Sequence, residues 1–418
     1  MRSRQTLLVS LMLALLPTGC GEPSLEVRGT LDRVVGETVT LKLVEGKGGF
    51  SSTMELVDSQ TVKYSSAALQ VKKPEANELS FVVPAGIAQG KASARIDRDD
   101  SGEPYVVPLD INRLALALDD KGAIETLPLT PATLAPSAIS SIDAAGGLIS
   151  LSPSGGELAV LAKDQLNLLA LGASSKPVGP GIAQTGGQAI AAVPDGVLVC
   201  TDSALLLVRI KQSTSQISAS ITGCKAVAAD STGVRAVVLS TCDSDNDTNE
   251  EDCLTEFQIG STISQVNRFS LDMTPSATHV AMRSDGKGAV VADSSVVYGV
   301  WLDGVGFTPV SVPWDQTAAV VGIDVTDSSL GDLFAVADGT SKQVRFLGFD
   351  SNANNDLKRV FDTALPETPI ALSFGPDAVL YVAAGTKLYS LNAEKPAEAP
   401  ALASISSANP ILFLQVQP

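Results

Sequence analysis

The sequence predicts an all-β protein, and three features of its 418 residues indicate this class. Apolar runs such as TVTLKLV, LLLVRI and VLYVAA are short and alternate, as half-buried strands do. Gly, Pro, Asp and Ser interrupt these runs at short intervals, which is typical of turns between strands. A turn followed by two apolar strands also recurs along most of the chain, so we expect a repeat architecture.

The N-terminus has the layout of a secretory signal peptide. Arg2 and Arg4 precede an apolar run from Leu7 to Leu16, which is shorter than the roughly 20 residues that a membrane-spanning helix needs. We therefore expect export rather than a spanning helix.

The run ends in LPTGC, which resembles the lipobox of bacterial lipoproteins, in which the cysteine is lipidated and becomes the first mature residue. The resemblance implies a signal peptide over residues 1–19, a lipidated Cys20 and an anchor and tether over residues 20–24. Pro17 stands where the box usually has leucine, and a plain secretion signal is the alternative. We expect a lipid-anchored protein of the bacterial cell envelope, on the periplasmic or the surface-exposed side of the outer membrane.

The charge limits the classes of partner. Removing residues 1–19 leaves 27 basic and 46 acidic side chains, a formal charge of −19. Such a surface repels nucleic acid and favours basic partners and divalent cations. Membrane contact through Cys20 and an envelope protein or polysaccharide partner are expected, and nucleic acid is not.

Four cysteines besides Cys20 allow disulfides after export, in three possible connectivities. Adjacency favours Cys242 with Cys253, which leaves Cys200 with Cys224. Zinc sites need C-x-x-C pairs or several histidines, and this chain has one histidine.

Residues 25–112 resemble the TIG (IPT) immunoglobulin-like domain. The resemblance rests on a strand TVTL, a glycine pair before Phe50 and the segment LSFVVPAGIAQGKASARI. That segment is expected to be the closing hairpin of the family, where Val83, Pro84 and Gly86 leave one strand and Gly90 starts the return. The resemblance implies an immunoglobulin-like β-sandwich that acts as a spacer or interaction module without chemistry of its own.

Residues 113–418 predict a β-propeller. Six turn markers lie 41, 37, 54, 43 and 48 residues apart, and periods of about 40 to 50 residues with several strands are typical of propeller blades. The markers are Ser152, Val193, Asp230, Ser284, Asp327 and Gly375. The segments SPSGGELAVL and GPDAVLYVAAGTKLYSL resemble blades of the YVTN or NHL class. The remaining segments RLALALDDKGAIETLPL and NPILFLQVQ are expected to close a seventh blade from both ends, with six or eight blades as alternatives.

An acidic insertion in the third repeat is the candidate metal site. CDSDNDTNEEDC is expected to be a hairpin loop between strands RAVVLSTC and CLTEFQI, with its two cysteines facing each other. Its Asp243, Asp245, Asp247 and Glu251 have the alternating spacing of calcium ligands. The alternatives are a structural Ca²⁺ site and a solvated acidic bulge.

Two shorter segments, DRDDSGE with Asp97, Asp99 and Ser101, and DSNANND with Asp350, Asn352, Asn354 and Asp356, are weaker candidates for metal binding. Ordinary hairpin turns use the same residue types.

Catalytic residues are not apparent in the sequence. The one histidine, His279, lies in a pattern typical of an innermost strand, and neither G-x-S-x-G nor H-E-x-x-H occurs. We expect a non-catalytic binding or scaffold module for a protein or glycan ligand. The alternative is a calcium-dependent propeller enzyme, lactonase-like or lyase-like, with acidic side chains in its channel.

Overall fold

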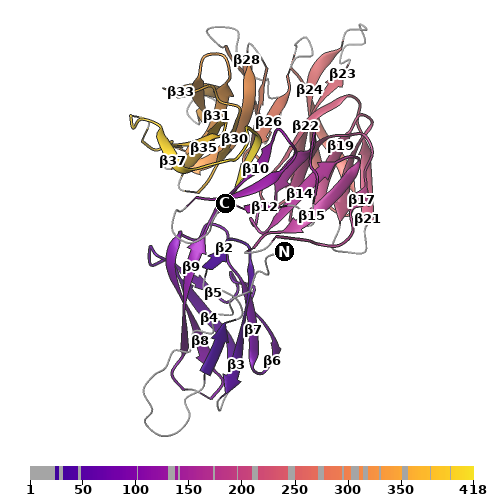
Figure 1. Cartoon of the computed structure of the whole chain (residues 1–418). Helices are drawn as coiled ribbons and strands as arrows, with labels where there is room; N and C mark the ends of the chain where they lie inside the picture. The colour runs from indigo at the N-terminus through magenta and orange to yellow at the C-terminus, as the bar shows by residue number, and fades with distance from the viewer. Residues whose placement is uncertain are drawn as a thin grey trace, which may run out of the picture. The chain divides into compact units, whose positions relative to one another are not determined.

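The computed structural model divides the chain into two compact units, Met1–Asn112 and Arg113–Pro418, which we call unit 1 and unit 2 (Figure 1). It describes residues 24–27, 32–45, 49–100, 102–129, 137–139, 142–172, 175–194, 196–209, 215–242, 250–271, 277–293, 296–302, 310–313, 319–328, 331–350, 356–376, 378–395 and 397–418. The all-β class predicted from the sequence is confirmed. No helix among these residues is long and apolar enough to cross a bilayer.

Unit 1 is a β-sandwich of two sheets. The first sheet has the order β1-β3-β7-β6 and contains β1 (Ser24–Val27), β3 (Thr38–Glu45), β7 (Glu78–Val82) and β6 (Lys72–Glu75). The second has the order β2-β9-β8-β4-β5 and contains β2 (Asp32–Val34), β9 (Tyr105–Asn112), β8 (Gly90–Arg98), β4 (Phe50–Val57) and β5 (Lys63–Ser65). Side chains of both sheets form one core, with Leu41 and Phe81 from the first and Leu56 and Ile96 from the second. Buried positions alternate with less buried ones along β7 and most of β9, as expected for strands with one face in a core.

The predicted closing hairpin of unit 1 is wrong in its pairing. Gly90 does begin a strand, as expected, but β7 pairs with β3 and β6, whereas β8 pairs with β4 and β9. The segment between them therefore passes from one sheet to the other. Gly86 and Gly90 have φ angles of 77° and 105°, a backbone region that favours glycine and that allows the chain to change direction here.

Unit 2 consists of repeated antiparallel sheets. We number six sheets from 1 to 6 in chain order, starting with the first complete repeat. The sheet that combines strands from both ends of unit 2 is sheet 7. Sheet 1 contains β13 (Leu148–Leu151), β14 (Glu157–Ala162), β15 (Gln165–Ala170), β16 (Lys176–Pro177) and β17 (Ile182–Ala183). Sheet 2 contains β18 (Gly187–Val193), β19 (Gly196–Thr201), β20 (Ala204–Arg209) and β21 (Ser215–Ser220). Sheet 3 contains β22 (Cys224–Ala229), β23 (Arg235–Cys242), β24 (Glu251–Ile259) and β25 (Ile263–Ser270).

The remaining sheets follow the same plan. Sheet 4 contains β26 (His279–Met282), β27 (Gly288–Ala292), β28 (Val296–Trp301) and β29 (Val310–Pro313). Sheet 5 contains β30 (Val320–Ser328), β31 (Gly331–Asp338), β32 (Gln343–Asp350) and β33 (Asp356–Ala364). Sheet 6 contains β34 (Ala371–Phe374), β35 (Val379–Ala384), β36 (Lys387–Asn392) and β37 (Ala401–Ser406). Sheet 7 has the order β12-β11-β10-β38 and contains β10 (Leu114–Asp119), β11 (Ile124–Pro128), β12 (Ser137–Ile139) and β38 (Ile411–Val416).

The sheets of unit 2 form a closed ring, which makes this unit a β-propeller. In the described residues, the first strands β13, β18, β22, β26, β30 and β34 each contact the next one, and β38 contacts both β34 and β13. Sheet 7 takes three strands from the start of unit 2 and β38 from the end of the chain, because Leu118 lies opposite Phe413 and Ala115 opposite Val416 (Figure 1). Closure from both ends, as the sequence predicts, leaves no first or last sheet with an open face.

The turns between first and second strands explain the repeat in the sequence. Each of the six sequence markers lies at or next to this turn in its sheet. In sheet 3 the Asp230 carboxylate accepts hydrogen bonds from the backbone N–H groups of Val234 (3.0 Å) and Arg235 (3.2 Å). Gly155, Gly233 and Gly286 occupy equivalent places in three sheets, with φ angles of 72°, 68° and 71°. The repeat in the sequence therefore arises because only a few residue types can form these turns.

Candidate functional site

The acidic insertion lies in the hairpin between β23 and β24 of sheet 3, as predicted. Asp243, Asp245 and Asp247 lie outside the described residues. Glu251 begins β24, opposite Cys242, and its carboxylate accepts a hydrogen bond from the Ser270 hydroxyl on β25. The described residues contain no group of three or more His, Cys, Asp or Glu side chains placed to hold a metal. The calcium site stays a prediction.

A disulfide joins Cys242 and Cys253 at the base of this hairpin, with a Cα–Cα separation of 5.9 Å. The sequence suggested that the two cysteines lie directly opposite each other, but the structure shows that they do not. Cys242 lies opposite Glu251, and Cys253 lies opposite Ser240, so the disulfide crosses the hairpin diagonally. The disulfide therefore fixes the register of the two strands from which the insertion leaves.

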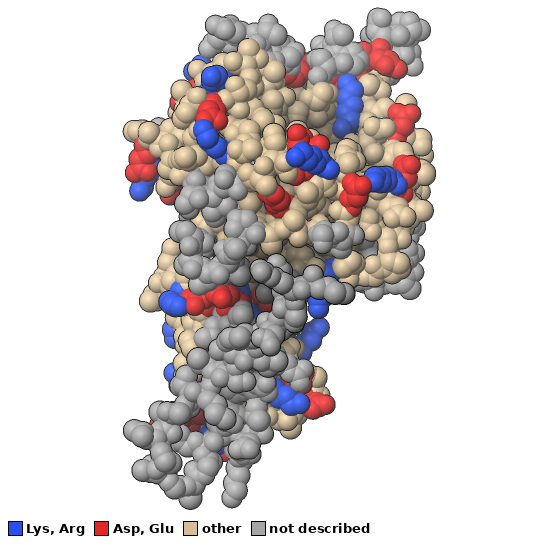
Figure 2. Space-filling model, viewed as in Figure 1, with Lys and Arg blue, Asp and Glu red and all other residues tan. Residues whose placement is uncertain are grey.

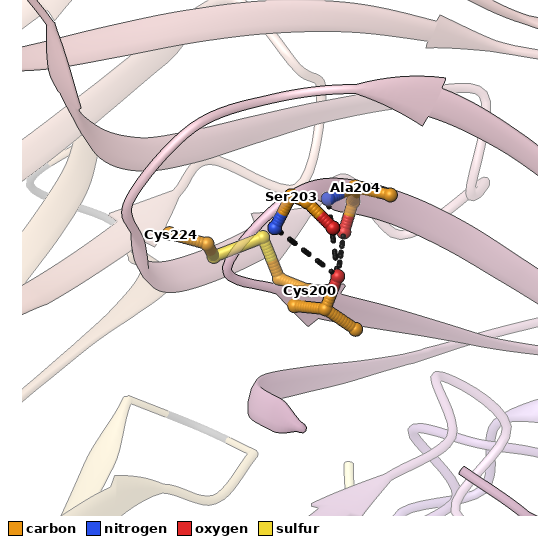
Figure 3. Close-up of a disulfide and its surroundings, with 5 residues drawn as sticks. Cys200, Ser203, Ala204 and Cys224 are labelled. Atoms are coloured by element: carbon orange, nitrogen blue, oxygen red, sulfur yellow. Dashed lines mark hydrogen bonds between the residues drawn. A yellow bond between two sulfur atoms is a disulfide. The ribbon is translucent and has the colours of Figure 1, made fainter. Parts of the chain in front are cut away.

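A second disulfide joins neighbouring sheets. Cys200 on β19 of sheet 2 is bonded to Cys224, the first residue of β22 in sheet 3, with a Cα–Cα separation of 6.1 Å (Figure 3). The turn after Cys200 is held by Thr201, whose hydroxyl accepts a hydrogen bond from the Ala204 N–H at 3.0 Å. The pairing agrees with that favoured by adjacency in the sequence. It connects the two sheets covalently.

Polar side chains on two of the innermost strands contact neighbouring protein groups. The His279 ring shares a hydrogen bond of 2.7 Å with the Thr278 hydroxyl, and burial lowers the pKa of the ring. Lys225 forms an ion pair with Asp252, which is fully buried. His279 therefore lies on an innermost strand, as predicted, and is neutral at pH 7.

Asp324 on β30 links two innermost strands. Its carboxylate accepts hydrogen bonds from the N–H groups of Val325 (2.8 Å) and of Phe374 on β34 (2.7 Å). Burial raises the pKa of Asp324 to about 6, although these hydrogen bonds and one from Ser373 oppose the shift. Ser373 in turn accepts a hydrogen bond from the Val416 N–H at 3.1 Å. These contacts connect β30, β34 and β38 around the ring.

Two of the weaker metal candidates, Asp99 and Asp350, make other contacts in the structure. The Asp99 carboxylate accepts a hydrogen bond from the Gly49 N–H at 2.5 Å, and Asp350 forms an ion pair with Lys358 at 2.7 Å. Ser101, Asn352 and Asn354 lie outside the described residues, as does Cys20.

A small cleft lies between sheets 2 and 3, and the sequence analysis missed it. Its volume is about 140 Å³, and it is lined by Ser220, Ile221, Thr222, Thr255, Phe257, Gln265 and Arg268. The first three leave the end of β21 toward β22, and the others lie on β24 and β25. Thr255 lies opposite Arg268, and Phe257 opposite Gln265, so these four side chains share one face of sheet 3. No sequence pattern identifies such a site, because its walls come from the edges of two different repeats.

The polar side chains of this inter-sheet cleft have no partners among the described residues. Within the described part of the chain, the side chains of Ser220, Thr222, Thr255, Gln265 and Arg268 make no hydrogen bond or ion pair. Thr255 is only 2% exposed. The other four side chains are exposed, so water solvates their polar atoms in the free protein. The cleft therefore holds hydrogen-bonding capacity that the fold itself does not use.

Several described lysines and arginines elsewhere form ion pairs with acidic side chains. On the face drawn in Figure 2, blue and red side chains lie next to each other at several places. Arg235 pairs with the buried Glu256, and Arg283 pairs with both Asp285 and Asp332. Arg268 differs from these arginines because no described carboxylate pairs with it.

Comparison with known proteins supports the fold. No protein-family model matches the chain, and no curated protein matches it. Among solved structures, a protein of unknown function from Desulfotomaculum acetoxidans DSM 771 is similar, with a TM-score of 0.55 and 12% identity over 73% of this chain and 98% of that chain. A protein from Lactobacillus plantarum has a TM-score of 0.52 and 12% identity over 73% of this chain and 99% of that chain.

Apo AztD from Citrobacter koseri is more distant, with a TM-score of 0.46 and 10% identity over 87% of this chain and 98% of that chain. At such low identity these likenesses bear on the fold alone.

Proposed function

We propose that this protein is a lipid-anchored module of the bacterial cell envelope that binds a protein or glycan ligand through its propeller without catalysis. The observation that carries the proposal is the inter-sheet cleft, where five polar side chains have no partner in the described part of the protein. Concave sites with a few convergent polar groups are typical places for ligands to bind. Unit 1, which resembles a TIG domain in sequence, is proposed as the spacer between the anchor and the propeller.

The anchoring part of the proposal rests on the LPTGC motif. Metabolic labelling with a palmitate analogue is expected to label the wild-type protein and to leave Cys20→Ala unlabelled. Absence of label from both would contradict lipidation and favour a plain secretion signal.

The binding part is tested by capture from envelope extracts. The immobilised full-length protein is expected to retain a protein or a polysaccharide from an extract of its own cells, and nucleic acid is expected to flow through because of the acidic surface. Failure to retain either class of bait at low and at physiological salt would contradict a binding role.

Calcium is proposed as a structural ion of the acidic insertion. Like charges held between two cysteines repel one another, and a divalent cation relieves this repulsion with a dissociation constant of about 0.1 to 1 mM, as in extracellular modules. Calcium at ten to a hundred times this constant is expected to stabilise the folded protein by about 1.4 to 2.7 kcal/mol. Thermal melts in EDTA and in calcium test this, with the Asp245→Ala, Asp247→Ala double variant as control. Identical wild-type melting temperatures in both conditions would identify the insertion as a solvated acidic loop.

A further inference from the structure

The inter-sheet cleft combines a cation with neutral groups that both donate and accept hydrogen bonds. Arg268 supplies a planar guanidinium suited to bidentate contact with a carboxylate. Ser220, Thr222 and Thr255 supply hydroxyls, and Gln265 supplies an amide. This set matches a ligand that carries one carboxylate and several hydroxyls, because hydroxyls accept from and donate to the same neutral side chains.

Arg268, Gln265, Ser220 and Thr222 are exposed, whereas Thr255 is buried. Thr255 is 2% exposed and lies directly opposite Arg268 in the ladder of β24 and β25. Its hydroxyl makes no hydrogen bond with another described residue. A ligand whose carboxylate contacts Arg268 therefore lies next to Thr255.

The size of the cleft limits the ligand to one ring. A volume of about 140 Å³ is below the several hundred Å³ of ordinary small-molecule pockets. It is close to the roughly 150 Å³ of an engineered cavity that holds a single benzene ring. Phe257, which is 1% exposed, and Ile221 supply apolar contact for the carbon face of such a ring.

We propose that this cleft binds a single sugar acid, a polyhydroxylated ring with a carboxylate, either free or as a terminal unit of an acidic glycan. Arg268 binds the carboxylate, and Thr255, Thr222, Ser220 and Gln265 bind hydroxyls. The proposal rests on the proposed binding function and names its ligand class. The Cys200–Cys224 disulfide holds together the two sheets that form the walls, so the site is fixed before the ligand arrives.

Calorimetric or NMR titration of the full-length protein with glucuronate and with glucose tests the proposal. The wild type is expected to bind glucuronate more tightly than glucose. Arg268→Gln is expected to weaken glucuronate binding about 10-fold or more, as loss of a charged hydrogen bond does, and to leave glucose binding unchanged. Thr255→Val is expected to weaken both. A third titration uses an oligosaccharide that ends in a uronate. Tighter binding of this oligosaccharide than of free glucuronate would identify a glycan end, rather than a free sugar acid, as the ligand.

Arg95→Gln is the matched control, because Arg95 is an exposed arginine on β8 that also makes no ion pair with a described residue and its loss changes the net charge equally. Equal glucuronate affinity in the wild type and Arg268→Gln would overturn the proposal, as would equal losses in Arg268→Gln and Arg95→Gln. Absence of binding by the wild type at millimolar glucuronate would also overturn it. In each of these cases, capture of an envelope partner by both the wild type and Arg268→Gln would leave the broader binding function standing.

Discussion

Gln417 is the side chain that ties the end of the chain into the propeller ring, and its replacement by alanine tests how the ring is closed. Its side-chain oxygen accepts a hydrogen bond from the Leu114 N–H at 2.9 Å, and its side-chain nitrogen donates one to the Gly155 carbonyl at 2.7 Å. Gln417 is fully buried. One amide therefore connects sheet 7 with the turn between β13 and β14 of sheet 1.

The magnitude follows from the groups that alanine leaves behind. Gln417→Ala removes two hydrogen bonds and leaves a buried N–H and a buried carbonyl without partners, at about 1 to 3 kcal/mol each. Partial relaxation and water entry reduce the sum, so we expect the free energy of unfolding to fall by about 2 to 4 kcal/mol. Gln415→Ala is the matched control, because Gln415 lies two residues earlier on β38, is only half-buried and makes no side-chain hydrogen bond with a described residue. We expect its effect to stay below about 0.5 kcal/mol.

Urea unfolding followed by tryptophan fluorescence measures this loss. Both tryptophans, Trp301 and Trp314, belong to unit 2, so the fluorescence signal reports on the propeller rather than on unit 1. Equal midpoints and slopes for Gln417→Ala and Gln415→Ala would refute the reasoning, because the buried amide would then contribute nothing to closure.

Two further predictions concern the disulfide between sheets and the pH dependence. The Cys200→Ala, Cys224→Ala double variant is expected to lose up to about 3.5 kcal/mol in urea unfolding, since the disulfide closes a loop of sequence separation 24; a loss below about 1 kcal/mol would contradict this. The raised pKa of Asp324, about 6, contributes stability that is fully present below the unfolded value of 3.8 and is lost as the pH rises through 6. That contribution is at most about 3 kcal/mol and is reduced by solvent screening, because the residue is partly exposed. Asp324→Asn is expected to flatten the stability profile between pH 4 and 7, and identical profiles for wild type and variant would contradict the assignment.

The sequence predicted the features that depend on local pattern. Turn markers such as Asp230 and Ser152 fall between the first and second strands because only some residue types satisfy those turns, so the repeat is visible without a structure. The closing strand β38 was also predictable, because an apolar segment remained at the end of the chain after six repeats. Local pattern thus identified both the architecture and the way it closes.

Pairing between distant segments could not be predicted in the same way. The segment after β7 reads as a hairpin, but Val83 belongs to the core shared by both sheets, and the chain crosses to the second sheet rather than returning along the first. The register of paired strands is equally difficult to predict from the sequence. Cys242 was expected opposite Cys253, but it lies opposite Glu251. A shift of two residues keeps both side chains on the same face of the sheet, so the alternation of buried and exposed positions does not reveal it.

The less regular features of the propeller are concentrated around sheet 3, and this arrangement has a physical consequence for binding. Sheet 3 carries three cysteines of the two disulfides, the acidic insertion and most of the walls of the inter-sheet cleft. Ordering two sheets around a small ligand costs conformational entropy, which subtracts directly from affinity. The disulfide between Cys200 and Cys224 already holds the two sheets together in the free protein. The conformational entropy of ordering them is therefore lost when the protein folds, and not when the ligand binds. Breaking that disulfide is therefore expected to weaken ligand binding at the cleft even under conditions where the propeller remains folded.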